Sequence, residues 1–244
     1  MRKSKFLKLT KKYSFLKSFY YFYNIYFRNK KFLKKSSQFG EDKYLLSLFE
    51  KDYKGIYLDV GCFHPTKHNN TYLFFKNGWQ GINIDLNPLT IDLFNFMRPK
   101  DININAGVSS NEEEKTLYFI DETNTQNTLS KNQLIFLKKH HNLKDEEILE
   151  KKIQTKRLDK ILDEHKINKI DFMNLDIEGH ELDVIQTIDF KKIRIHFICV
   201  EMINHNDLSK KSSLQIEKLL EKNNFSLIKK FDFNYIFKNK DFRY

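Results

Sequence analysis

Two acidic residues end apolar runs that have the length of β-strands. Asp59 belongs to the run at residues 56–60, which Gly61 follows, and Asp85 ends the run at residues 81–85. Asp85 lies 24 positions beyond Gly61, close to the spacing at which nucleotide-binding sheets place a carboxylate on a ribose hydroxyl. Gly61 permits close approach to the backbone, and Asp59 adds a negative charge beside it. We predict that these residues bind a positively charged nucleoside cofactor.

The residues after Gly61 exclude one class of cofactor. They read Cys62-Phe63-His64-Pro65, so the G-x-G-x-x-G pattern that cradles a pyrophosphate does not occur there. A nicotinamide dinucleotide is therefore not expected. S-adenosylmethionine (SAM) has no pyrophosphate, and its ammonium and sulfonium groups suit a carboxylate such as Asp59. The alternative is an ordinary turn at the end of a strand.

A third acidic segment follows the apolar run at residues 169–175. It reads Asp176-Ile177-Glu178-Gly179-His180-Glu181 and places four ionisable side chains in six positions. Because open α/β sheets bind ligands at the carboxyl ends of their strands, we predict that Asp176, Glu178 and His180 are catalytic, with His180 as the base. Alternatively, the acids only cap the following helix and the histidine holds the loop.

A metal ion is the alternative means of activating a hydroxyl nucleophile. Asp176 and Glu201 end neighbouring predicted strands, and their carboxylates could converge on Mg²⁺ with Asn204 nearby.

Thiolate metal clusters are excluded, because Cys62 and Cys199 are the only cysteines. Both lie in apolar runs, which indicates buried thiols in a reducing compartment and hence a cytoplasmic protein.

Short apolar runs alternate with helical segments from residue 37 onward, which is the pattern of a doubly wound α/β sheet. We predict seven strands, at residues 55–60, 81–85, 101–105, 169–175, 195–201, 225–231 and 234–238. The last two can form only an antiparallel hairpin, whereas the earlier strands leave room for crossover helices. The expected fold is therefore a mostly parallel, seven-stranded, Rossmann-like sheet with an antiparallel C-terminal hairpin, the class I methyltransferase topology.

One catalytic domain is expected over residues 37–244, after an N-terminal extension at residues 1–36. An insertion at about 106–156 separates the third and fourth strands, with a strand predicted at 116–120 and a polar helix at about 130–151. It is too long for a plain crossover. We therefore expect it to cover the active site and to recognise the substrate.

The net charge of +11 comes from one end of the chain. Residues 1–36 hold twelve Lys or Arg and no Asp or Glu, which leaves 31 basic and 32 acidic residues elsewhere. The extension predicts a basic amphipathic helix, because steps of three and four separate Leu9, Tyr13, Leu16, Tyr20, Tyr23 and Phe27. Its longest uncharged run, residues 18–27, is too short to span a bilayer. We expect peripheral contact with the inner face of the membrane; packing on the domain or on a second subunit of an oligomer is the alternative.

Several segments resemble the FkbM-type methyltransferases. They are residues 37–42, 58–61 with His64-Pro65, 70–74, 78–85, 155–162 and 171–181. Together they cover nearly all of residues 37–201. The resemblance implies SAM-dependent transfer of a methyl group to a hydroxyl, often in glycan or natural-product pathways. We take a sugar hydroxyl, as in polysaccharide biosynthesis, as the expected acceptor.

The resemblance also implies cofactor contacts at Gln38, Glu41, Asp59, Gly61, Asp85, Asn105, Ala106 and Asp176. It places the methionine moiety at Asp59 and Gly61, the ribose at Asp85 and the adenine at Asn105-Ala106. The leading motif at residues 37–42 would lie near the cofactor or over it.

Two rival functions remain. A nucleic-acid methyltransferase could use the basic extension to grip phosphate, but enzymes that methylate base amino groups usually have a proline–proline–aromatic turn after the fourth strand, as a platform for a flipped base. Here Asp176 is followed by Ile177-Glu178-Gly179. The other rival is a non-catalytic, membrane-associated module with the same fold, which the intact acidic positions argue against.

Overall fold

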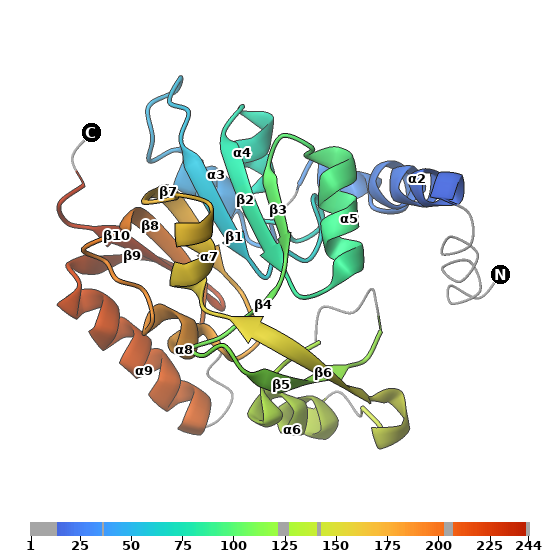
Figure 1. Ribbon diagram of the computed structural model, residues 1–244. Coiled ribbons are helices and arrows are strands. Elements are labelled where there is room, and N and C mark those ends of the chain that lie inside the picture. The colour runs from blue at the N-terminus through green and yellow to red at the C-terminus, as the bar shows by residue number, and fades with distance from the viewer. Residues whose placement is uncertain (1–13, 36, 122–126, 141–142, 203–206, 243–244) are drawn as a thin grey trace.

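Seven strands form one sheet in the order β3-β2-β1-β7-β8-β10-β9. The computed structural model describes residues 14–35, 37–121, 127–140, 143–202 and 207–242. The strands are β1 (Ile56–Val60), β2 (Gln80–Asp85), β3 (Ile102–Asn105), β7 (Lys169–Leu175), β8 (Arg194–Glu201), β9 (Phe225–Phe231) and β10 (Asn234–Asn239). The first five pair in parallel, and β10 pairs antiparallel with β8 and β9 (Figure 1). The predicted Rossmann-like sheet with an antiparallel C-terminal hairpin is confirmed.

The central strands are apolar on both faces because helices cover both sides of the sheet. Alternate side chains along a strand point to opposite faces, so Leu58 and Met173 belong to one buried cluster, while Tyr57 and Phe172 belong to the other. Helices α7 (Leu158–Glu164), α8 (Glu181–Ile185) and α9 (Asp207–Lys222) contribute to the first cluster. Helices α3 (Glu41–Leu46) and α4 (Tyr72–Lys76) contribute to the second, and α5 (Pro88–Met97) packs along β2 and β3.

The insertion forms a small sheet of its own. Its strands are β4 (Gly107–Val108), β5 (Glu114–Phe119) and β6 (Leu149–Lys156), in the order β4-β6-β5. Strand β5 confirms the strand predicted at 116–120. The helix predicted at about 130–151 is wrong in its second half, because α6 (Lys131–His140) is followed by a 3-10 turn, η3 (Asp145–Glu147), and then by β6. Antiparallel pairing with β5 overrides the helix propensity of this Lys- and Glu-rich segment.

The described part of the N-terminal extension is helical, as predicted, and one side of it packs on the domain. It comprises α2 (Ser14–Phe22), a π-helical segment η1 (Tyr23–Arg28) and a 3-10 turn η2 (Lys30–Leu33). Tyr21 and Ile25 are buried, whereas Tyr23 and Phe27, predicted for the apolar face, are exposed. The π-helix shifts the angular spacing of the side chains, and contact with α5 selects the face. Leu9 and Tyr13 lie outside the described residues.

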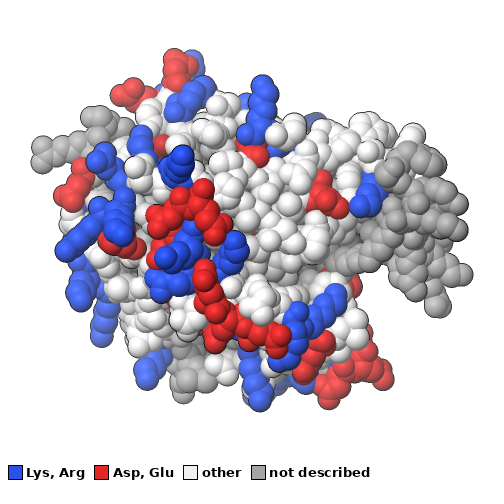
Figure 2. Space-filling view, in the orientation of Figure 1, with Lys and Arg blue, Asp and Glu red and all other residues white. Residues whose placement is uncertain are grey.

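Charged side chains of both signs are interspersed over the lower and left parts of the face shown in Figure 2. This fits the near-zero net charge of the chain outside residues 1–36. Among the described helices, none is long and apolar enough to cross a membrane.

Candidate active site

A pocket lies at the carboxyl edge of the sheet, where open α/β folds bind ligands. Loops that follow four strands line it: residues 61–63 after β1, 85–87 after β2, 176–180 after β7, and Glu201 at the end of β8. The insertion contributes Asn127 and Leu129, and the segment before α3 contributes Gln38. Three acidic segments that are far apart in the sequence therefore meet in one cavity.

Gly61 allows the ends of β1 and β7 to come together. Its φ of +80° is favourable only for glycine, and a Cβ atom at this position would lie 1.7 Å from the main-chain oxygen of Asp176. The Gly61 N–H donates to Ile84 O at 2.9 Å. The predicted close approach at Gly61 is therefore to the protein's own β7 segment, and this approach shapes the pocket floor.

Asp59 is fully buried beneath the pocket and accepts three side-chain hydrogen bonds. The donors are Asn69 Nδ2 at 2.9 Å, Thr71 Oγ1 at 2.7 Å and Asn174 Nδ2 at 2.9 Å. Burial raises the pKa of Asp59, and these donors partly offset the rise. Asp59 also lines the pocket, and one acceptor position of Oδ1 is not used by these three bonds.

Arg98 supplies a positive charge near the buried Asp59 carboxylate. No pattern in the sequence indicated that Arg98 would be buried there. Its side chain is fully buried and donates to Tyr57 Oη at 3.0 Å, Thr71 Oγ1 at 3.0 Å and Asn69 Oδ1 at 2.9 Å, and also to Pro65 O. Asn69 and Thr71 therefore connect the Arg98 guanidinium to the Asp59 carboxylate. An arginine is almost never fully buried unless it is paired.

Asp85 lies at the end of β2 with its carboxylate held by the main chain. It accepts from Phe63 N at 2.9 Å and Asn87 N at 2.7 Å. Burial raises its pKa to about 6, against the opposing effect of these two bonds. Each oxygen keeps a second acceptor position, and Asp85 lines the pocket, so it can accept a hydroxyl of a bound ligand.

The other predicted cofactor residues occupy different places. Ala106 and Gln38 line the pocket, whereas Asn105 does not line it and donates its side-chain amide to Asp85 O at 2.9 Å. Glu41 is buried behind the wall and accepts from Asn234 Nδ2 at 2.7 Å and Phe39 N at 2.9 Å. Asn234 lines the pocket, so Glu41 holds a pocket-lining amide and does not itself line the pocket.

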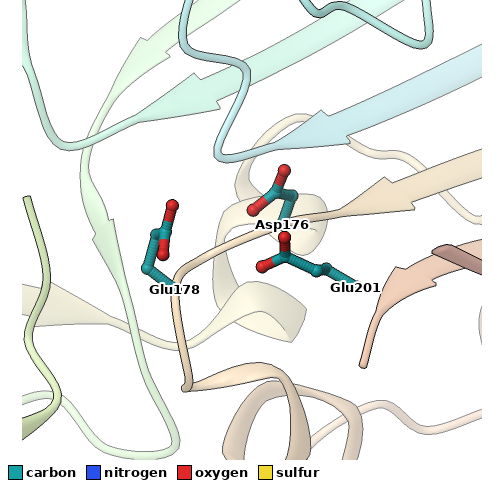
Figure 3. A group of neighbouring side chains, drawn as sticks. All are labelled: Asp176, Glu178 and Glu201. Atoms are coloured by element: carbon teal, nitrogen blue, oxygen red, sulfur yellow. The ribbon is translucent and has the colours of Figure 1, made fainter. Parts of the chain in front are cut away.

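Asp176, Glu178 and Glu201 form an acidic cluster in the pocket (Figure 3). One carboxylate oxygen from each lies within 4.8 Å of those of the other two. Burial, together with repulsion from Glu181, raises the pKa of Asp176 to about 7, and burial and mutual repulsion hold those of Glu178 and Glu201 well above their usual range. The predicted convergence of Asp176 and Glu201 is therefore observed, with Glu178 as a third member. Asn204 lies outside the described residues.

The loop that carries the cluster is held from both sides. The buried carboxylate of Glu181 accepts from Ile177 N at 3.0 Å and from Gly179 N at 3.1 Å. From the insertion, Gln133 Nε2 donates to Glu178 Oε2 at 3.0 Å, and Thr128 Oγ1 donates to the Glu178 main-chain oxygen at 2.8 Å. The insertion thus lies against the pocket, as predicted.

His180 faces the pocket with one nitrogen anchored. Its Nδ1 lies 3.0 Å from Asp183 Oδ2 in α8. Nε2 is buried and has no hydrogen-bond partner among the described residues. Since an ionised carboxylate can only accept, Nδ1 carries a proton toward Asp183. In the neutral ring, Nε2 would then hold the lone pair that a general base requires.

A second pocket adjoins the first along the same loop. Glu201 lines both pockets, and residues 178–181 lie between them. The second pocket is lined mainly by uncharged polar and apolar side chains of α6 and α9, including Ser130, Asn132, Gln133, Phe136, Ser209, Ser212 and Ser213. No Lys, Arg or His is among the described residues that line it.

Sequence reasoning missed the amides that connect these groups. Asn70 Nδ2 donates to Asn174 Oδ1 at 3.0 Å, and Asn174 in turn donates to Asp59. Both asparagines line the pocket. The available signal was Asn174 itself, a polar residue inside an apolar strand, because such a residue requires buried partners.

A seven-stranded sheet of this topology, with acidic groups at the carboxyl ends of β1, β2 and β7, defines a Rossmann-like methyltransferase fold. The Methyltransferase FkbM domain family matches residues 59–227, and the chain belongs to this family. No curated protein matches the chain. Among solved structures, the crystal structure of archaeal TYW1 is similar over 70% of this chain and 50% of that chain, at 13% identity and a TM-score of 0.28; a likeness this weak carries no argument.

We expect Arg98→Met to lower the free energy of unfolding by about 3–5 kcal/mol, because it leaves several buried acceptors and the Asp59 charge without their cation. Urea denaturation followed by circular dichroism measures this. Arg157→Met is the control, since Arg157 forms a partly exposed pair with Asp159 and should change stability little. Equal effects of the two substitutions would contradict a stabilising role for Arg98.

The acidic cluster predicts that the ligand-free protein loses stability as the pH rises. Asp176 binds its proton more tightly in the folded state, with a pKa of about 7, so the unfolding free energy falls between about pH 4 and pH 7. Asp176→Asn should therefore stabilise the protein at pH 8 by about 1 kcal/mol or more, and change little near pH 5. Thermal unfolding of both proteins at the two pH values tests this, with the exposed Asp163→Asn as control. If Asp176→Asn changed the stability by the same amount at both pH values, the proposed titration of Asp176 would be contradicted.

Proposed function

We propose that this protein is a SAM-dependent O-methyltransferase whose acceptor is a hydroxyl group of a sugar. The observation that carries the proposal is the joint placement of an acidic pocket, the unpartnered Nε2 of His180 and an adjoining pocket with no Lys, Arg or His among its described lining residues. Membership of the FkbM family supports methyl transfer. The two free, buried cysteines fit a reducing, cytoplasmic setting.

The charge and shape of the first pocket suit SAM. When bound, SAM supplies the electrophilic methyl group on its sulfonium. Asp85 is placed to accept ribose hydroxyls, and Ala106 with Val108 offers an apolar wall for the adenine. The carboxylates of Asp59 and Asp176 supply the negative charge that an ammonium and a sulfonium require.

The second pocket suits an uncharged, hydroxyl-rich acceptor. Its serine, asparagine and glutamine side chains can both donate to and accept from sugar hydroxyls. The absence of Lys, Arg and His among its described lining residues, together with the nearby acidic cluster, disfavours a phosphate-bearing acceptor. We therefore infer that the acceptor hydroxyl reaches the methyl group along the shared wall at Glu201.

Proton removal is assigned to His180. A sugar hydroxyl is a poor nucleophile near neutral pH, so a positioned base lowers the barrier to its attack. Asp183 holds Nδ1, which leaves Nε2 to take the proton from the hydroxyl, and the negatively charged Asp183 stabilises the resulting imidazolium. Asp183 is thus a positioning residue.

Mg²⁺ is the second means of activating the hydroxyl. Three carboxylates with oxygens within 4.8 Å of one another form a donor set that Mg²⁺ accepts. Asp176, Glu178 and Glu201 would hold the ion, and a bound ion would lower the pKa of a hydroxyl next to it.

Asp85→Asn should weaken SAM binding by about 10- to 100-fold, because it removes a charged acceptor worth roughly 1.5–3 kcal/mol. Isothermal titration with SAM measures the affinity, with Asp163→Asn as the control. The affinity of the unmodified protein should also fall as the pH drops through about 6, where Asp85 takes up a proton. Unchanged affinity in both Asp85→Asn and Asp59→Asn would exclude this cofactor site, and no binding by the unmodified protein would support a non-catalytic module.

His180→Ala should lower turnover at saturating SAM by about 10²–10⁴-fold without loss of SAM affinity, and EDTA should have no effect. Asp183→Asn should give a smaller loss and shift the pH profile of turnover, because the imidazolium loses its counter-charge. Methyl transfer from labelled SAM to a panel of uncharged glycans and sugar phosphates provides the rates. Near-normal turnover of His180→Ala would remove His180 from the mechanism. Loss of activity in EDTA with recovery in Mg²⁺ would favour the metal.

A further inference from the structure

The first helical segments expose a contiguous set of aromatic side chains. Exposed fractions are 71% for Phe19, 47% for Phe22, 57% for Tyr23, 37% for Tyr26 and 59% for Phe27. These five residues, here named the aromatic face, follow one another at steps of three, one, three and one, which keeps them on one side of α2 and η1. Rings of successive turns touch, with centroids 5.1 Å apart for Phe22–Tyr26 and 6.4 Å for Tyr23–Phe27.

Such a cluster differs from the other exposed apolar residues of the protein. The remaining large ones among the described residues lie singly on other parts of the surface, except for the pair Phe39 and Phe233, whose ring centroids are 6.4 Å apart. They are Phe39, Phe96, Ile135, Leu149, Leu214, Leu227 and Phe233. Scattered residues of this kind are normal on a soluble surface, whereas a contiguous patch indicates an interaction site.

The opposite side of the same segment is fixed to the domain. Ile25 is fully buried, and the Tyr21 hydroxyl donates to Asp92 Oδ2 at 2.7 Å. The buried amides of Asn24 and Asn29 contact His64 Nε2 at 2.9 and 3.3 Å. These contacts point the aromatic face outward, and Figure 1 shows α2 extending past α5, away from the sheet. The face is therefore presented in one orientation before any partner binds.

The segments that carry the aromatic face hold basic side chains and no acidic ones. Its own segments and the residues that follow carry Lys17, Arg28, Lys30, Lys31, Lys34 and Lys35, and the first acidic residue of the chain is Glu41. Outside residues 1–36 the acidic and basic residues nearly balance. Electrostatic attraction to a negatively charged surface therefore acts mainly through this end of the molecule.

We propose that the aromatic face is a docking surface for an anionic lipid bilayer. Aromatic side chains at one face of a helix, flanked by Lys and Arg, bind at the headgroup level, where rings enter the interface and cations contact lipid phosphates. A second copy of the chain fits less well, because pairing two such faces would bring two purely basic segments together. The docking surface does not depend on the chemistry proposed for the pocket.

Co-sedimentation of the full chain with phosphatidylcholine vesicles, with and without phosphatidylglycerol, tests the proposal. The intact protein should bind the vesicles that contain phosphatidylglycerol, and added salt should weaken this binding because it screens the attraction. The triple substitution Phe19→Gln, Phe22→Gln and Phe27→Gln should lower the vesicle partition coefficient by about tenfold or more, since each ring removed takes apolar area from the interface.

The matched control replaces three equally exposed apolar residues elsewhere, Ile135→Gln, Leu149→Gln and Leu214→Gln. It should bind vesicles like the intact protein, and melting curves should show both triple variants folded. Failure of the intact protein to bind vesicles, or equal loss in both variants, would overturn the proposal. So would a dimer that the Phe substitutions dissociate, or tighter binding to RNA than to vesicles.

Discussion

The pocket depends on a charge buried under its floor. Asp59 has no solvent contact, and its carboxylate is tolerated because Asn69, Thr71 and Asn174 donate to it while Arg98 holds two of those donors from behind. The network links the loop after β1, the end of α5 and β7. A buried charge that loses a partner costs several kcal/mol, so these elements keep one arrangement, and the pocket is formed before a ligand arrives.

Four acidic side chains gather above that floor. Asp85, Asp176, Glu178 and Glu201 all lie in one cavity, and burial raises the pKa of each. In the ligand-free protein the cavity therefore keeps protons that exposed carboxyl groups would have lost near neutral pH. A cation bound among these groups would favour their ionised forms and release those protons.

Two segments outside the seven-stranded sheet, the insertion and the N-terminal extension, are joined to the pocket. Hydrogen bonds as well as apolar packing make this connection. The insertion reaches the loop after β7 through Gln133 and Thr128, which both contact Glu178. The N-terminal extension reaches the loop after β1 through Asn24 and His64, and the neighbouring Phe63 lines the pocket. Burial lowers the pKa of His64 to about 3, so this connection stays neutral over the physiological range. Both segments are thus coupled in position to loops that line the pocket.

The positions of the sheet strands and their parallel or antiparallel type followed from the sequence, because parallel strands covered on both faces are continuous apolar runs and the short β9–β10 connection permits only a hairpin. Asp85, Asp176 and His180 were predicted at strand ends, and all three line one pocket, because parallel strands end at the same edge of the sheet. Tertiary structure alone decided the rest. Residues 149–156 became a strand because β5 offered a partner, and the buried face of the extension depended on contact with α5. Arg98 and Asn174 acquired their roles from partners far away in the chain, which no local pattern encodes.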